Sequence, residues 1–147
     1  MKKMIALVLV SICVIALVGC AKQQKEQPLV SLMPTQKMIE DIAAGNLEKA
    51  WYPVYNRMAD PELKENLELY AQMFAGREVK RCDCYDYERT GERSPEGSDY
   101  TEITYYKIYL TEDYYGEPDY YAKAVHITDG EGTGTISLEI YEEDPVK

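Results

Sequence analysis

The segment Ile136-Ser137-Leu138-Glu139-Ile140 decides the fold, because apolar and polar side chains alternate along its whole length. Successive side chains of a β-strand point to opposite faces, so this alternation predicts a strand with one buried and one exposed face. Ile136, Leu138 and Ile140 are expected to point inward, and Ser137 and Glu139 outward. The C-terminal end of the chain is therefore expected to belong to a half-buried sheet.

Three upstream segments have a similar composition, rich in tyrosine, threonine and branched aliphatic residues. They predict three further strands at 78–88, 100–110 and 120–127. Glycine, serine, proline and acidic residues gather between them and predict loops at 90–98 and 112–118. Asp129-Gly130-Glu131-Gly132-Thr133-Gly134 predicts a hairpin loop in which the glycines supply positive φ angles. The four strands are expected to form an antiparallel meander.

Before Gly76 the apolar residues recur at helical spacing, which predicts three short helices. Each has a candidate N-terminal cap: Thr35, Asn46 and Asp60. Each also has a stop or break: Gly45, Pro53 with a kink near Tyr52, and Gly76. Helices followed by a meander predict an α+β domain, with the N-terminal helices packed on one face of a curved four-stranded antiparallel sheet.

The turn between the first two helices reads Ala44-Gly45-Asn46-Leu47-Glu48-Lys49-Ala50. This turn and the order of elements resemble small bacterial lipoproteins of the cystatin-like, nuclear-transport-factor-two-like superfamily. The resemblance covers residues 35–142 and implies a conical pocket between the curved sheet and the helices. It implies no particular activity, because this fold hosts enzymes, binding proteins and scaffolds alike.

The first nineteen residues have the pattern of a secretory signal. Lys2 and Lys3 form a positive start, and 4–18 is apolar apart from Ser11. A helix that spans a membrane needs about 20 apolar residues, so this run is too short to be retained as a span. We expect it to direct export and then to be removed.

Leu17-Val18-Gly19-Cys20 resembles the lipobox of bacterial lipoproteins. The resemblance implies cleavage between Gly19 and Cys20 and a diacylglyceryl thioether on Cys20, whose two chains anchor stably. It divides the chain into a signal peptide (1–19), a lipidated cysteine with a flexible tether (20–34) and a single α+β domain (35–147). The domain would sit outside the cytoplasm, on the cell membrane or the outer membrane. The alternative is a secreted protein in which Cys20 carries no lipid.

The chain is acidic, with 26 aspartates and glutamates against 16 lysines and arginines and a net charge of −10. Removing residues 1–19 takes away Lys2 and Lys3, so the mature chain carries a net charge of −12. Such a chain is repelled by nucleic acids and by anionic lipid surfaces. We therefore expect no nucleic-acid partner, and membrane attachment through the lipid on Cys20.

Two cysteines belong to the expected domain, Cys82 and Cys84. Two residues apart on a strand, they share a face and are poorly placed to bridge each other, so the main interpretation is two small core side chains. A strained disulfide or a redox role stays open. Zinc needs four ligands, and the single histidine, His126, is distant in sequence. The acidic loop at 129–134 lacks the alternating carboxylates of an EF-hand, so neither a metal nor a cofactor is expected.

Tyrosine is overrepresented, with 14 tyrosines against one phenylalanine. The doublets Tyr105-Tyr106 and Tyr120-Tyr121 lie on expected strands and should place one ring on each face. Phenol groups combine apolar area with a hydrogen-bonding group, which suits sugars, peptides or a protein partner. These four tyrosines and His126 form the candidate binding surface, although tyrosine is also simply a good strand residue.

The function favoured by these patterns is a non-enzymatic envelope lipoprotein that binds a small ligand or a protein partner. The sequence contains no nucleophile elbow, P-loop or dinucleotide fingerprint. Two alternatives remain open. One is an isomerase, dehydratase or hydrolase that uses His126 or a buried carboxylate in a pocket. The other is a structural component of an envelope complex.

Overall fold

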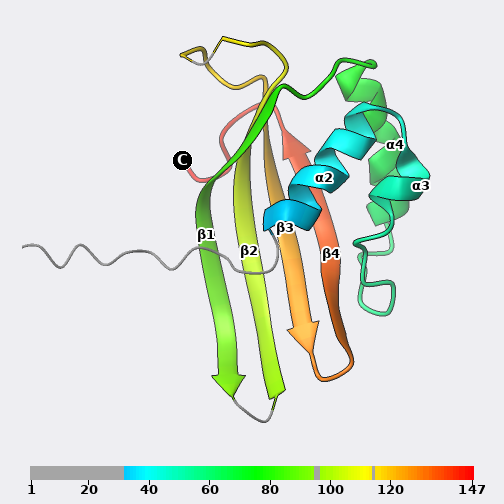
Figure 1. Ribbon diagram of the computed structural model, residues 1–147, viewed down its shortest axis with the longest axis vertical. Helices are drawn as coiled ribbons and strands as arrows, with labels where there is room; N and C mark the ends of the chain where they lie inside the picture. Colours follow the sequence, from blue (N-terminus) through cyan, green and yellow to red (C-terminus); the bar gives the residue numbers. More distant parts are fainter. Residues whose placement is uncertain (1–31, 95–96, 114) are drawn as a thin grey trace, which may run out of the picture.

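The computed structural model describes residues 32–94, 97–113 and 115–147 (Figure 1). The predicted signal peptide, Cys20 and most of the tether lie outside these residues. In the described part, no helix combines the length and the apolar character needed to cross a membrane. The helices are α2 (Leu32–Ala43), α3 (Leu47–Ala50) and α4 (Leu63–Phe74). The strands are β1 (Arg81–Ser94), β2 (Gly97–Tyr109), β3 (Tyr120–Asp129) and β4 (Gly132–Tyr141).

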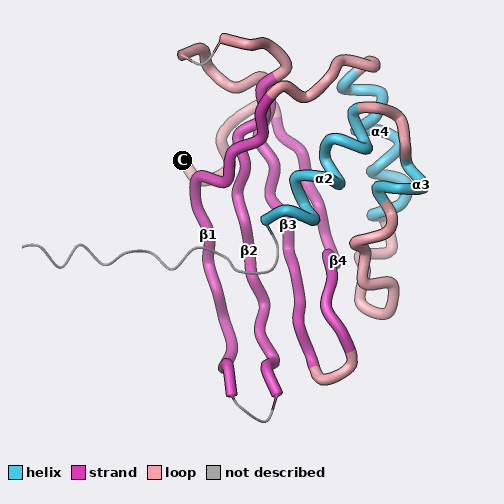
Figure 2. The backbone as a smooth tube through the Cα atoms, viewed as in Figure 1, coloured by secondary structure: helices cyan, strands magenta, loops and turns pink. Residues whose placement is uncertain are grey.

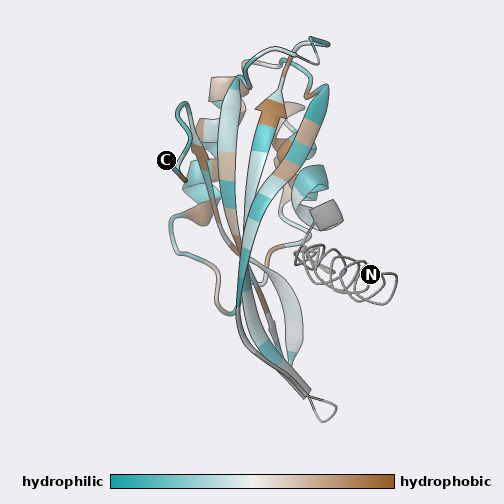
Figure 3. Ribbon diagram, turned by 90° about the vertical axis from the view of Figure 1, so that its left-hand side faces the viewer, coloured by the Kyte–Doolittle hydropathy of each residue, from teal (hydrophilic) through white to brown (hydrophobic). Residues whose placement is uncertain are grey.

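The four strands form one antiparallel sheet in the order β1-β2-β3-β4, so the predicted meander and the α+β class are confirmed. The helices lie together on one side, with α2 across a face of the sheet and α3 and α4 beside β4 (Figures 1 and 2). The strands continue past the helices to the two hairpins and are strongly twisted (Figure 3). Twist of this kind follows from the chirality of the chain.

The core lies between α2, α4 and the inner face of the sheet. Side chains buried in it come from alternating residues of β2, β3 and β4, as the pleat requires, and the half-buried Cys82 and Cys84 of β1 pack against it. The inner face of the sheet contributes Tyr106, Ile108, Ala122, Ala124, Leu138 and Ile140. The helices contribute Met38, Ile39, Ile42, Leu63, Leu67 and Phe74.

The alternation in β4 is confirmed at Leu138 and Ile140, which are buried, but the prediction is wrong for Ile136. Val125 pairs with Ser137 and His126 with Thr135, so Ile136 is left unpaired and only half-buried. This is a β-bulge, in which one extra residue reverses the alternation that follows. Thr135 is buried in its place.

The hairpin between β3 and β4 is tighter than predicted, because both strands extend into the 129–134 segment. The expected positive φ angles are not found there, since the described glycines with positive φ are Gly45, Gly76 and Gly91. Instead, the Asp129 carboxylate accepts the N–H groups of Glu131 and Gly132, both at 2.9 Å. Such side-chain bonds close a turn without left-handed backbone.

Glycine is required at position 134 because the segment 53–55 packs closely against it. A Cβ at this position would lie 2.8 Å from the Pro53 carbonyl oxygen and 2.9 Å from Cβ of Tyr55. The segment 53–55 runs parallel to β4 here, and Thr135 exchanges two backbone hydrogen bonds of 2.8 Å with Pro53 and Tyr55. This segment pairs with the outer edge of β4 and fixes the chain that follows α3.

The predicted helix starts are only partly right. Thr35 lies inside α2, which begins at Leu32, so its predicted capping role is wrong. Asn46 precedes α3 but forms no side-chain capping bond. The predicted capping role of Asp60 is also wrong, because α4 begins at Leu63 with Glu62 at the capping position. The Asp60 carboxylate instead accepts the N–H of Glu62 at 2.9 Å and closes the turn that leads into the helix.

The strand and loop bounds also differ. β1 begins at Arg81, not at 78, and runs to Ser94, while β2 begins at Gly97. Most of the predicted loop at 90–98 is therefore strand, because pairing continues to Ser94 and Gly97. The predicted loop at 112–118 does separate β2 from β3.

We predict that Ala75→Gly stabilises the protein. Ala75 ends α4 in the left-handed region, at φ 51°, where a Cβ is unfavourable. Glycine relieves this strain and should raise the free energy of unfolding by about 0.5–1 kcal/mol, measured by urea denaturation. Gln72→Gly, in the regular part of the same helix, is the matched control and should lower it by a similar amount. A loss of stability in Ala75→Gly would contradict the strain argument.

Candidate functional site

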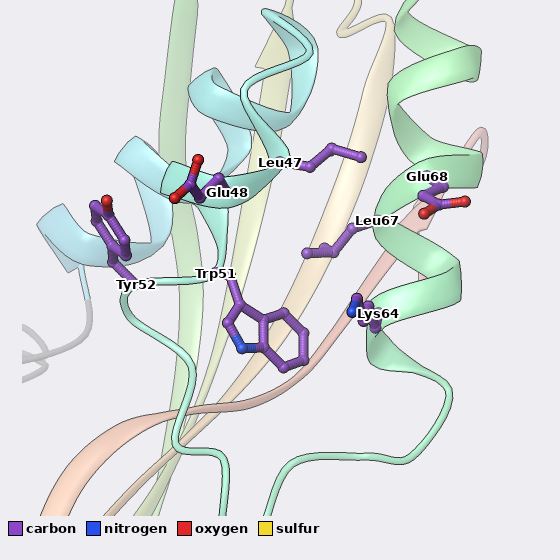
Figure 4. Close-up of a pocket in the computed structure, with 7 residues that line it drawn as sticks. All are labelled: Leu47, Glu48, Trp51, Tyr52, Lys64, Leu67 and Glu68. Carbon is purple, nitrogen blue, oxygen red and sulfur yellow. The ribbon is translucent and has the colours of Figure 1, made fainter.

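A groove lies between α3 and α4, with a volume of about 380 Å³ (Figure 4). Helix α3 ends after one turn, and Pro53 cannot supply the backbone N–H that would continue it. The chain leaves the helix at Trp51, whose indole lies at the groove. The residues that line it are Leu47, Glu48, Trp51, Tyr52, Lys64, Leu67 and Glu68.

The groove has an apolar floor and a charged rim. Leu67 is buried and Leu47 is half-buried, and Figure 4 shows their side chains extending toward each other from α3 and α4. Glu48 lies on the α3 side, and Glu68 and Lys64 lie on the α4 side. An apolar floor with carboxylates at two edges suits an apolar group that carries a positive charge, and the indole face adds a cation–π contact.

A second hollow, of about 300 Å³, lies on the other side of Tyr52. It is lined by Pro34, Lys37, Met38, Asp41, Lys49, Tyr52 and Pro53. Tyr52 is shared by both hollows, and 76% of its surface is exposed. The two hollows therefore occupy one continuous side of the helical layer.

The four tyrosines predicted as a binding surface are divided between the two faces of the sheet. Tyr106 is fully buried in the core, and Tyr120 packs edge-on against Phe74 at 5.4 Å between ring centroids. Tyr105 and Tyr121 both pack around Tyr85, at 6.4 and 6.2 Å. The structure does not bring the four rings together, and none of them lines the groove.

Tyr85, against which Tyr121 packs, is also fixed by the C-terminal segment. The Tyr85 hydroxyl donates to Oδ1 of Asp144 at 2.7 Å. This bond lowers the pKa of Asp144, while burial raises the pKa of Tyr85. Tyr121 is only 8% exposed. Tyrosines that are buried or bonded within the chain in this way stabilise the fold and offer little surface to a ligand.

His126 lies on the inner face of the sheet and is 3% exposed. Its Nδ1 lies 3.3 Å from Oγ1 of Thr135, and its Nε2 lies 3.3 Å from Oγ1 of Thr133. Both ring nitrogens therefore have a hydrogen-bond partner within the fold. Glu102 is its partner across β2 and β3, and Arg89 contacts that carboxylate. Burial lowers the pKa of His126, and the charge of Glu102 opposes the shift in part. The histidine belongs to a buried polar network, apart from the residues of the groove.

We predict that the single histidine makes stability depend on pH above the range where carboxylates titrate. Because the folded pKa of His126 is lowered, the unfolded chain binds the proton first. The free energy of unfolding should be constant between about pH 6.5 and pH 8 and should fall below pH 6.5, by at most about 1.4 kcal/mol per pH unit. Urea denaturation at several pH values measures this slope. His126→Gln should abolish it between about pH 5 and pH 7, and an unchanged slope would contradict the assignment.

Cys82 and Cys84 are free thiols that pack against the core, in agreement with the main interpretation of the sequence. Burial raises the pKa of both thiols, which keeps them protonated and unreactive near neutral pH. Within residues 32–94, 97–113 and 115–147, no three histidine, cysteine or acidic side chains are grouped to hold a metal ion.

Comparison of the chain with protein-family models, with curated proteins and with solved structures finds no match in any of the three. The assignment of the site therefore depends on the geometry of this chain. The helical spacing of the apolar residues before Gly76 does not indicate a groove at Trp51. The available signal was Pro53, two residues later, which ends the helix and leaves the indole half-exposed.

Proposed function

We propose that this protein is a lipid-anchored envelope lipoprotein with a cystatin-like domain, and that the domain binds an apolar group carrying a positive charge. The groove around Trp51 is the observation that carries the binding role. Its volume is in the range of small-ligand sites, and it combines a leucine floor, an indole and two carboxylates, which outnumber the one ammonium group of Lys64. The ligand is an amine with an apolar body, either a small molecule or a basic side chain of a protein partner.

The anchor is supported by the lipobox-like Leu17-Val18-Gly19-Cys20 and by the positive and apolar segments before it. The acidity of the mature chain favours cationic ligands, because a negative surface attracts them and raises their association rate. Buried partners around His126 favour a structural role for that residue, which makes binding a better-supported function than acid–base catalysis.

Trp51 is the single tryptophan of the chain, so its fluorescence reports directly on the groove. We expect phenylethylamine to change the Trp51 emission in a saturable way, and phenylpropionate, which has a similar body and a negative charge, to have little effect. A basic aromatic peptide, titrated in parallel, distinguishes a small-molecule site from a peptide site. Equal responses to the amine and the carboxylate would contradict the proposed charge preference.

We predict that Glu48→Gln and Glu68→Gln each weaken amine binding by about fivefold, which corresponds to about 1 kcal/mol for an exposed charge pair. Both carboxylates lie at the groove, whereas Glu65, one turn before Glu68 on α4, does not line it. Glu65→Gln is the matched control and should leave the dissociation constant unchanged. The amine titration of Trp51 fluorescence measures all three variants.

The anchor is tested separately with Cys20→Ser. We expect the native protein to sediment with membranes and the mass of its N-terminal peptide to include a diacylglyceryl group. The variant should lose this group and leave the membrane fraction. A native peptide without added lipid would exclude the anchor and leave the groove experiments unaffected.

A further inference from the structure

The hollow beside the first turns of α2 has a surface suited to a membrane interface. Pro34, Met38 and Pro53 line it with apolar groups, and Lys37 and Lys49 lie among them. Tyr52 stands at its border with its ring mostly exposed, and Figure 4 shows it next to the N-terminal part of α2. Tyrosine and lysine beside apolar groups are typical of the headgroup layer of a bilayer.

The charge of this side also differs from that of the whole chain. Asp41 is 6% exposed and is paired with Lys37 at 3.1 Å, and Glu40 lies 3.7 Å from the same ammonium group. Lys49 is exposed and forms no ion pair with a described residue. The lining is thus close to neutral or slightly positive, although the mature chain carries −12. Repulsion from anionic lipid headgroups is therefore weak on this side.

The length of chain before the domain places the same side near the membrane. Helix α2 begins at Leu32, twelve residues after Cys20. Twelve residues span at most about 40 Å when fully extended. A lipid on Cys20 therefore keeps the start of α2 near the bilayer, and Pro34 belongs to both that start and the hollow.

We infer that the tether-side surface, defined as Pro34, Lys37, Lys49, Tyr52 and Pro53, rests on the phospholipid headgroups of the membrane that holds the anchor. This inference rests on the lipid anchor proposed above. It goes beyond that anchor in giving the domain a fixed orientation. Because Tyr52 is shared with the groove, the groove opens close to the bilayer surface. Its ligand would then be met at the membrane.

The test uses the full lipidated protein, reconstituted in phosphatidylethanolamine and phosphatidylglycerol vesicles that contain phospholipids brominated on the acyl chain. Trp51→Phe/Tyr52→Trp places the single tryptophan on the tether-side surface. Trp51→Phe/Tyr115→Trp is the matched control, because Tyr115 is fully exposed in the connection between β2 and β3, at the end of the sheet away from the first turn of α2 (Figure 1). Bromine quenches tryptophan only over short distances.

We expect the brominated lipids to reduce the emission of Trp51→Phe/Tyr52→Trp and to leave that of Trp51→Phe/Tyr115→Trp unchanged. Lys49→Glu should diminish the quenching at position 52. If the protein stays with the vesicles and positions 52 and 115 are quenched equally, or neither is quenched, the inference is overturned while the anchor stands. Failure to stay with the vesicles would overturn the anchor and the inference with it. If the double variants do not fold, quenching of native Trp51 decides the same question.

Discussion

Replacing Phe74 by alanine should lower the free energy of unfolding by about 3–5 kcal/mol. Phe74 is fully buried in the last turn of α4 and packs edge-on against Tyr120 of β3. The Tyr120 hydroxyl in turn donates to the Met73 carbonyl oxygen at 3.2 Å, so this ring joins the helix to the sheet. Removal of the phenyl group loses its transfer free energy and leaves a cavity that the two elements cannot close.

Urea denaturation of the protein, followed by circular dichroism, measures the effect of Phe74→Ala. Leu69→Ala on the same helix is the matched control, because Leu69 is 55% exposed and its truncation should change stability by no more than about 0.5 kcal/mol. Phe74→Leu should fall between the two, since it keeps most of the buried area. Equal losses for Phe74→Ala and Leu69→Ala would show that α4 is not held to the sheet through this ring.

The layered fold follows from local patterns in the sequence. Leu138 and Ile140 alternate with polar residues, and Leu63, Leu67 and Phe74 recur at helical spacing, so each element shows which of its faces is buried. Short connections then leave an antiparallel meander with the helices on one side. Such information is carried by residues close together in the chain, which is why it could be predicted.

Features that depend on partners distant in sequence could not be predicted. The bulge at Ile136 coincides with the pairing of Thr135 with segment 53–55, more than seventy residues earlier. Gly134 was interpreted as a turn glycine, yet it is small because Pro53 and Tyr55 pack against it. In both cases the local pattern was compatible with a regular strand or turn, and a tertiary contact decided the outcome.

The candidate site was missed for a related reason. The number of tyrosines in the sheet predicted a binding surface there, but their rings pack against or bond to neighbours such as Phe74, Tyr85 and Asp144. The groove instead arises where Pro53 ends a helix and leaves Trp51 facing α4. Amino-acid composition shows which residues are numerous, but the groove depends on how α3 packs against α4, which composition does not show.

The second large effect is expected at the buried carboxylate of Glu102, which is 0% exposed on the inner face of β2. Its Oε1 accepts Nε of Arg89 at 2.9 Å and Nη2 at 2.5 Å, and Arg89 is itself only partly exposed. Removing one partner of a buried ion pair leaves the other charge without compensation. Glu102→Gln should therefore lower the free energy of unfolding by about 3–5 kcal/mol at neutral pH.

A double variant separates the contribution of charge from that of packing. Replacing both partners, in Arg89→Met/Glu102→Gln, should restore part of the lost stability, because the guanidinium that has lost its bonds to Glu102 is removed as well. Glu88→Gln is the matched control on the neighbouring strand, where the exposed carboxylate contributes little. If the double variant is less stable than Glu102→Gln by the full cost of Arg89→Met alone, the two groups are not coupled. The polar network around His126 would then be held by packing, and its charges would play no part in the stability of the sheet.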